Sequence, residues 1–138
     1  MTRLLAALIV VLISSQVSAM NSLSELTWKK RVVIVFGDAG DARVERQIET
    51  LTDQRLELEE RDLVVIRVVD DEATAAFGNA AEPDAVGLRN EADVKQGSFR
   101  VVLVGKDGGI KLRSETIVPD VDLFDLIDRM PMRQAERG

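Results

Sequence analysis

Residues 99–113 read FRVVLVGKDGGIKLR, and this stretch decides between the two folds that the rest of the chain allows. A predicted strand from Phe99 to Val104, apolar except for Arg100, is followed by Lys106-Asp107-Gly108-Gly109, in which Asp-Gly accepts the positive φ of a tight turn. Ile110 to Arg113 then alternates apolar and basic residues, which is typical of an edge strand. We therefore expect two antiparallel strands joined by a hairpin.

Upstream of this hairpin, two apolar runs enclose a helical pattern. The runs at 31–36 (RVVIVF) and 63–69 (LVVIRVV) lack alternation, which is typical of strands buried on both faces. Between them, residues 42–60 place Val44, Ile48, Leu51 and Leu58 on one face, which predicts one long helix. Strand, helix and strand in this order predict a parallel crossover, with the first run at the centre of the sheet.

The remaining segments carry weaker patterns. The stretch 72–97 is the least defined: Ala73 to Phe77 reads as the start of a helix, 78–84 as a loop and 85–94 as a short helix. Pro119 opens a last helix, which Pro131 ends. Its predicted buried residues are Leu123, Phe124, Ile127 and Met130.

The resulting order, β-α-β-α-β-β-α, predicts an α/β, thioredoxin-like fold. We expect a mixed four-stranded sheet with flanking helices. The alternative is a small flavodoxin-like sheet, in which strands would keep alternating with helices. The Asp-Gly hairpin breaks that alternation and favours the first fold.

The N-terminus has the pattern of an export signal. A positive start at Arg3 precedes ten apolar residues, 4–13, and small residues at Val17 and Ala19 fit cleavage after Ala19. A membrane-spanning helix needs about 20 apolar residues, roughly twice this run. We expect a signal peptide at 1–19, one domain at 20–131 and a polar, frayed tail at 132–138. The protein is then exported, periplasmic or secreted, with no membrane anchor after cleavage.

The composition excludes several chemistries. The 138 residues include no cysteine and no histidine, which rules out thiol redox chemistry, a Ser-His-Asp triad and a Cys or His metal site. The net charge of −6 and the short basic run at 29–31 argue against nucleic acid as a partner. We expect no cofactor, an unknown protein or small molecule as partner, and a monomer, since Lys111 and Arg113 discourage pairing at their edge strand.

Acidic residues follow both predicted parallel strands. Asp38 and Asp41 come after the first, and Asp70 and Asp71 after the second. The carboxyl ends of parallel strands commonly hold ligands, and carboxylate oxygens suit Mg²⁺ or Ca²⁺. A divalent cation at these four residues is therefore one prediction. The alternative is that they cap helices and form a solvated acidic edge.

Several segments resemble a family of uncharacterised domains. They include Leu26-Thr27-Trp28-Lys29, the Val-Gly-Lys-Asp-Gly-Gly hairpin at 104–109 and Met130-Pro131-Met132. The family occurs in short exported bacterial proteins and has relatives in extracellular proteins of the Dro/Urb and sushi-repeat types. The family is considered thioredoxin-like, closest in plan to peroxiredoxins, and its activity is not established. The resemblance therefore implies the fold and export rather than a reaction.

The resemblance to a peroxiredoxin-like plan also indicates a candidate site. The reactive cysteine of that plan would lie within 37–43, where this chain has none. Arg100 corresponds to an arginine that points at the reactive residue, so we expect it near Asp38 or Asp41. Together with Arg43 these residues form either a ligand site or an Arg–Asp pair that ties a loop to a strand.

Three functional hypotheses remain. The leading one is an exported, non-enzymatic thioredoxin-like module that binds a protein or a small ligand. The second is a Mg²⁺- or Ca²⁺-dependent hydrolase that uses Asp38, Asp41 and Asp70. The third is a structural protein of the cell envelope without a ligand.

Overall fold

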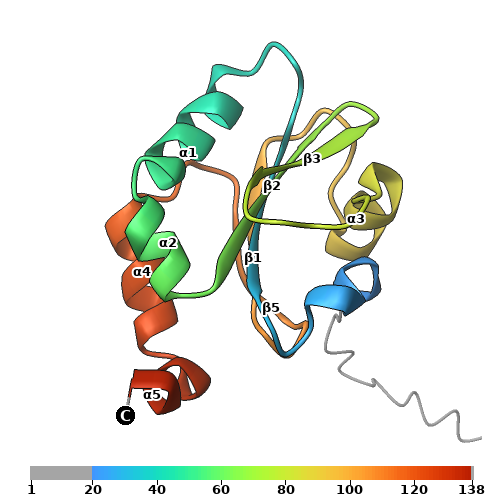
Figure 1. Ribbon diagram of the computed structural model, residues 1–138. Helices are drawn as coiled ribbons and strands as arrows, with labels where there is room; N and C mark the ends of the chain where they lie inside the picture. Colours follow the sequence, from blue (N-terminus) through green and yellow to red (C-terminus); the bar gives the residue numbers. More distant parts are fainter. Residues whose placement is uncertain (1–19, 138) are drawn as a thin grey trace, which may run out of the picture.

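The computed structural model describes residues 20–137 and contains one mixed sheet with helices on both faces (Figure 1). The predicted signal peptide at 1–19 lies outside the described residues. The strands are β1 (Arg31–Gly37), β2 (Leu63–Val69), β3 (Glu72–Phe77), β4 (Arg100–Val104) and β5 (Ile110–Ser114). The helices are η1 (Asn21–Leu26), α1 (Ala42–Thr52), α2 (Arg55–Glu60), α3 (Ala85–Ala92), α4 (Asp120–Asp128) and α5 (Pro131–Arg137).

The predicted centre of the sheet is confirmed. The strand order is β3-β2-β1-β4-β5, and every residue of β1 is buried. β1 runs parallel to β2, from Arg31 opposite Leu63 to Gly37 opposite Val69, and antiparallel to β4. The crossover and the hairpin at 105–109 therefore form as the sequence predicts. In the turn, Gly108 has a φ of 82°, and the Gly109 amide donates to Asp107 Oδ1 at 2.9 Å.

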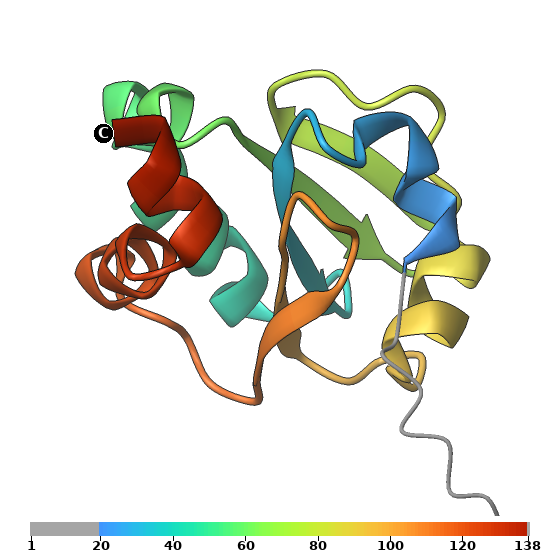
Figure 2. The ribbon, with the colours of Figure 1, turned by 90° about the horizontal axis from the view of Figure 1, so that it is seen from below.

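The sheet separates two hydrophobic cores (Figures 1 and 2). On one face, α1, α2 and α4 cover Val33, Val35 and Val65. On the other, η1 and α3 cover Ile34 and Ile66. Alternate residues of β1 and β2 enter opposite cores, which explains why the apolar runs show no alternation.

The predicted helix start at 73–77 is wrong, because these residues form β3. β3 pairs antiparallel with β2, from Val69 opposite Glu72 to Ile66 opposite Ala75, and a bulge then sets Phe77 opposite Val65. The sheet therefore has five strands rather than four. Three alanines in this segment favour a helix locally, but the free edge of β2 provides backbone partners that override this preference.

The predicted single helix at 42–60 is two helices. α1 ends at Thr52, whose hydroxyl donates to the Ile48 carbonyl oxygen at 2.9 Å, and Gln54 leaves the helical region with φ −106° and ψ 51°. The break lets Leu51 and Leu58 both become fully buried. Side-chain bonding to the backbone of the preceding turn is a known cause of bent or interrupted helices.

The predicted frayed tail is also wrong, because residues 131–137 form α5. Pro131 begins this helix instead of only ending the previous one, as its fixed φ and missing amide allow. Arg133 is buried and donates to the Glu60 carbonyl oxygen at 3.0 Å. Glu136 accepts hydrogen bonds from Arg31 at 2.8 and 3.2 Å. Charged contacts rather than apolar burial hold α5 to the domain.

None of the helices in the described part of the chain combines the length and apolar character that crossing a bilayer would require.

Candidate functional site

The first turn of α1, where the reactive thiol of a peroxiredoxin-like plan would lie, is closed by the chain itself. Asp41 caps α1 by accepting the Arg43 amide at 3.0 Å. The Arg43 guanidinium returns to the same carboxylate, with Nη2 2.7 Å from Oδ2, and stacks 4.6 Å from the centre of the Phe99 ring. The hydrogen bond from Arg43 lowers the pKa of Asp41. The Arg43 amide, which could receive an anion at this helix start, therefore already faces a carboxylate.

Arg100 does not reach this carboxylate, so the predicted pair with Asp38 or Asp41 is wrong. Its Nη1 lies 2.6 Å from Glu115 Oε1. The register of the β4–β5 hairpin explains why Arg100 pairs with Glu115, because Val101 lies opposite Ser114 and this brings Glu115 beside Arg100. Arg100 fastens the end of the hairpin, which is a structural role.

The four carboxylates predicted for a cation do not gather. Asp38 lies against Gly97, where an added Cβ would be 3.2 Å from Oδ1. Asp70 is exposed and its carbonyl oxygen accepts from Arg89, while Asp71 lines a separate hollow of about 380 Å³. Within residues 20–137, no three acidic side chains are grouped as metal ligands. The structure thus brings Asp41 and Arg43 together, but neither Asp70 nor Asp71 with them.

A larger concavity than the hollow at Asp71 lies elsewhere, at the end of the sheet where β2 begins. It is a groove of about 950 Å³ between η1 and α2. β3 ends before Gly78, whose φ of 77° turns the chain, and the first residues of β2, Leu63 and Val64, line the groove. An added Cβ at Gly78 would lie 3.1 Å from Val64 Cγ2, so glycine is required for both the bend and the close approach.

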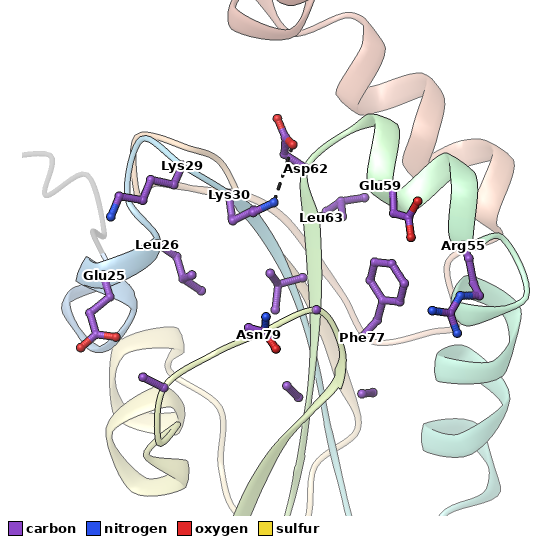
Figure 3. Close-up of a pocket in the computed structure, with 15 residues that line it drawn as sticks. Glu25, Leu26, Lys29, Lys30, Arg55, Glu59, Asp62, Leu63, Phe77 and Asn79 are labelled. Carbon is purple, nitrogen blue, oxygen red and sulfur yellow. Dashed lines mark ion pairs between the residues drawn. The ribbon is translucent and has the colours of Figure 1, made fainter.

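The groove has an apolar floor and charged walls. Leu63, Ala75, Ala76 and Phe77 contribute to the floor. Glu25, Lys29 and Lys30 lie on the η1 side, and Arg55 and Glu59 lie on α2 (Figure 3). Lys30 is paired with Asp62 at 3.7 Å, whereas Lys29 and Arg55 have no ion-pair partner within residues 20–137. An apolar floor with a few unpaired charges suits a polypeptide better than a small polar metabolite.

The sequence model of one domain family matches residues 22–136, which is most of the chain. The chain belongs to the DUF4174 family. The family is described as a domain of unknown function, so membership adds no reaction. No curated protein shows significant similarity to this DUF4174 chain.

Two solved structures show the fold of this DUF4174 domain. It is similar to a reduced 2-Cys peroxiredoxin of Plasmodium vivax, with a TM-score of 0.55, 13% identity and coverage of 84% of this chain and 85% of the other. It is also similar to a thiol:disulfide interchange protein from Bacteroides sp., with a TM-score of 0.51, 14% identity and coverage of 73% and 72%. The predicted thioredoxin-like fold is confirmed. At these identities the likeness concerns the fold alone.

The groove of the DUF4174 domain was missed at the sequence level. Its α2 wall follows an unpredicted helix break, and Phe77 belongs to the strand that reads as a helix. The available signal was Phe77 followed by Gly78, since an aromatic residue favours a strand and a glycine allows the chain to turn at its end.

Proposed function

We propose that this DUF4174 domain is an exported, non-enzymatic binding module that takes an extended polypeptide segment at the groove and the adjoining edge of β3. It works without thiol redox chemistry, since the chain contains no cysteine. The observation that carries the proposal is the groove itself, where an edge strand ends and leaves apolar floor residues beside unpaired charges.

The contacts favour an extended ligand. A peptide laid along the edge of β3 would gain main-chain hydrogen bonds from that strand, as in strand addition. One of its side chains would rest on the floor near Ala76 and Phe77, and an acidic group would meet Arg55 or Lys29. The closed first turn of α1 supports the same conclusion, because Asp41 and Arg43 already satisfy each other.

A peptide-display selection on the purified protein tests the proposal, with random 12-residue peptides as probes. We expect an enriched set whose dissociation constants are micromolar and rise at least about tenfold in Ala76→Glu, which adds a charge to the floor. Val121→Glu is the matched control, because Val121 is also an exposed apolar residue but lies on α4, outside the groove. Absence of enrichment, or peptides that bind Ala76→Glu as well as the unchanged chain, would refute the proposal.

A further inference from the structure

β3 is an edge strand without the usual protection against pairing. The opposite edge, β5, carries Lys111 and Arg113, whereas Ala73 to Phe77 has neither a charge nor a proline. Within residues 20–137, no other strand or loop is hydrogen-bonded through its backbone to the outer side of β3. The one charge of β3 is at its first residue, Glu72, and the other five residues leave a free edge that is a template for another strand. β3 is therefore the place where the sheet can be extended. The monomer was expected because Lys111 and Arg113 protect the β5 edge, and they do not protect β3.

The two ends of β3 point their side chains to the same face of the sheet. Glu72 lies opposite Val69 and Phe77 lies opposite Val65, and both valines belong to the core under α1 and α2. Thr74, two residues after Glu72, faces the same side. The bulge between Ala75 and Phe77 is what brings residues five apart onto one face.

These faces allow a symmetric pairing centred on Thr74. If a second β3 runs antiparallel about a two-fold axis normal to the sheet, Thr74 lies opposite its own equivalent. Ala73 then lies opposite Ala75. Because the bulge leaves Ala76 without a partner of its own, the next residues to face each other are Glu72 and Phe77. Every pair shares a face, as antiparallel pairing requires, and the interface is isologous. Facing threonines form a favourable cross-strand pair.

In this register, Glu72 at the start of β3 complements Arg55 of α2, which packs against Phe77 at the end of β3. The Arg55 guanidinium carbon lies 5.6 Å from the centre of the Phe77 ring. Neither Arg55 nor Glu72 has an ion-pair partner within residues 20–137. Residues directly opposite in an antiparallel pair have Cβ atoms about 5 Å apart, so Glu72 of one copy comes within reach of Arg55 of the other. The two-fold axis repeats this contact.

We infer that the strand bound at this edge is β3 of a second copy of the chain. The two sheets then join into one, related by a two-fold axis that passes between the two Thr74 residues. The inference rests on the proposed function and names the partner of that site. The self-complementary register distinguishes a second copy from a foreign peptide. One molecule supplies both charges, Glu72 at the start of β3 and Arg55 of α2 against Phe77 at its end.

Sedimentation velocity of the purified protein, from micromolar to millimolar concentration, tests the inference by charge reversal. We expect the mass to rise from one chain to two. Glu72→Arg and Arg55→Glu each raise the dimer dissociation constant about tenfold or more, because each creates two like-charge contacts. The double variant Glu72→Arg/Arg55→Glu restores the opposite-charge pairs, and we expect its constant to return to within about threefold of the unchanged value.

Two controls carry the same charge changes elsewhere. Glu49 and Arg129 are exposed and lie on α1 and just after α4, so Glu49→Arg and Arg129→Glu should leave the dimer unchanged. Single reversals without effect, or a double variant as weak as the singles, would overturn the inference. A chain that stays monomeric while selected peptides bind in an Ala76-dependent way overturns it too, but leaves the proposed function standing. If the chain stays monomeric and no peptide binds in an Ala76-dependent way, both the inference and the proposed function are overturned.

Discussion

Glu136→Gln should lower the free energy of unfolding by more than its terminal position suggests. Glu136 is near the end of the chain, yet its carboxylate is held at 2.8 Å by Arg31 Nη2 and at 3.1 Å by Lys106 Nζ. The Arg31 side chain is only 1% exposed, and its other hydrogen bond goes to the Arg61 carbonyl oxygen at 2.9 Å. Removing the carboxylate charge therefore leaves a buried guanidinium without its counter-ion.

The structure sets the size of this loss. Removing one partner of a fully buried ion pair costs about 3–5 kcal/mol. The Glu136 side chain is 25% exposed, and α5 can move away and admit water, so we expect about 2–3 kcal/mol. Glu115→Gln is the matched control, since it breaks the Arg100 pair where the Glu115 side chain is 78% exposed, and should cost under about 1 kcal/mol.

Urea unfolding followed by far-ultraviolet circular dichroism measures both variants, because Trp28 is 66% exposed and its fluorescence would report weakly on the core. The loss should also depend on pH. The Arg31 hydrogen bond lowers the pKa of Glu136 in the folded protein. The contribution of ionised Glu136 to the free energy of unfolding is thus fully present above its unfolded-state pKa of about 4.3. It is lost as the pH falls through the lower pKa that Glu136 has in the folded protein. Equal losses for Glu136→Gln and Glu115→Gln at pH 7 would show that Glu136 does not hold Arg31.

Three further changes test other parts of the fold. Gly37→Ala should cost about 1–3 kcal/mol in urea unfolding, because its Cβ would lie 2.4 Å from Val44 Cγ2, whereas Gly40→Ala, with open space around it, should be nearly neutral. Asp128→Asn should make the free energy of unfolding depend less steeply on pH in the acidic range. Burial alone would raise the pKa of Asp128, but hydrogen bonds from Arg61 and Arg133 lower it, so its stabilisation is lost as pH falls below about 4. Leu51→Ala should lower the free energy of unfolding by about 2–5 kcal/mol, because Leu51 is on the buried face of α1 and is fully buried; a loss under about 1 kcal/mol in thermal or urea unfolding would contradict the core packing.

The elements that sequence reasoning predicted are those whose pattern is local. β1 and β2 are continuous apolar runs, and the Asp107-Gly108 turn has a conformational requirement that two residues reveal. β3 differs, because Ala75 and Ala76 favour a helix on their own and only the vacant edge of β2 makes them a strand.

In the candidate site, too, local contacts could be predicted from the sequence and contacts between distant residues could not. Capping of α1 by Asp41 is a local effect and was foreseen as one of two alternatives. The partner of Arg100 depends on the register of the hairpin, and the partner of Glu136 lies 105 residues away in sequence. The groove depends on three non-local facts at once: the helix break before α2, the bend at Gly78 and the position of η1. No spacing in the sequence encodes that combination.

The most direct test of the binding module is an amide-resolved NMR titration of the ¹⁵N-labelled protein with one selected peptide. If the groove and the β3 edge form the site, the largest shift changes fall on Leu63, Val64 and residues 74–79. Changes centred instead on residues 38–43 and 97–99, where the thiol of a peroxiredoxin-like plan would lie, would contradict it and place the site at the first turn of α1.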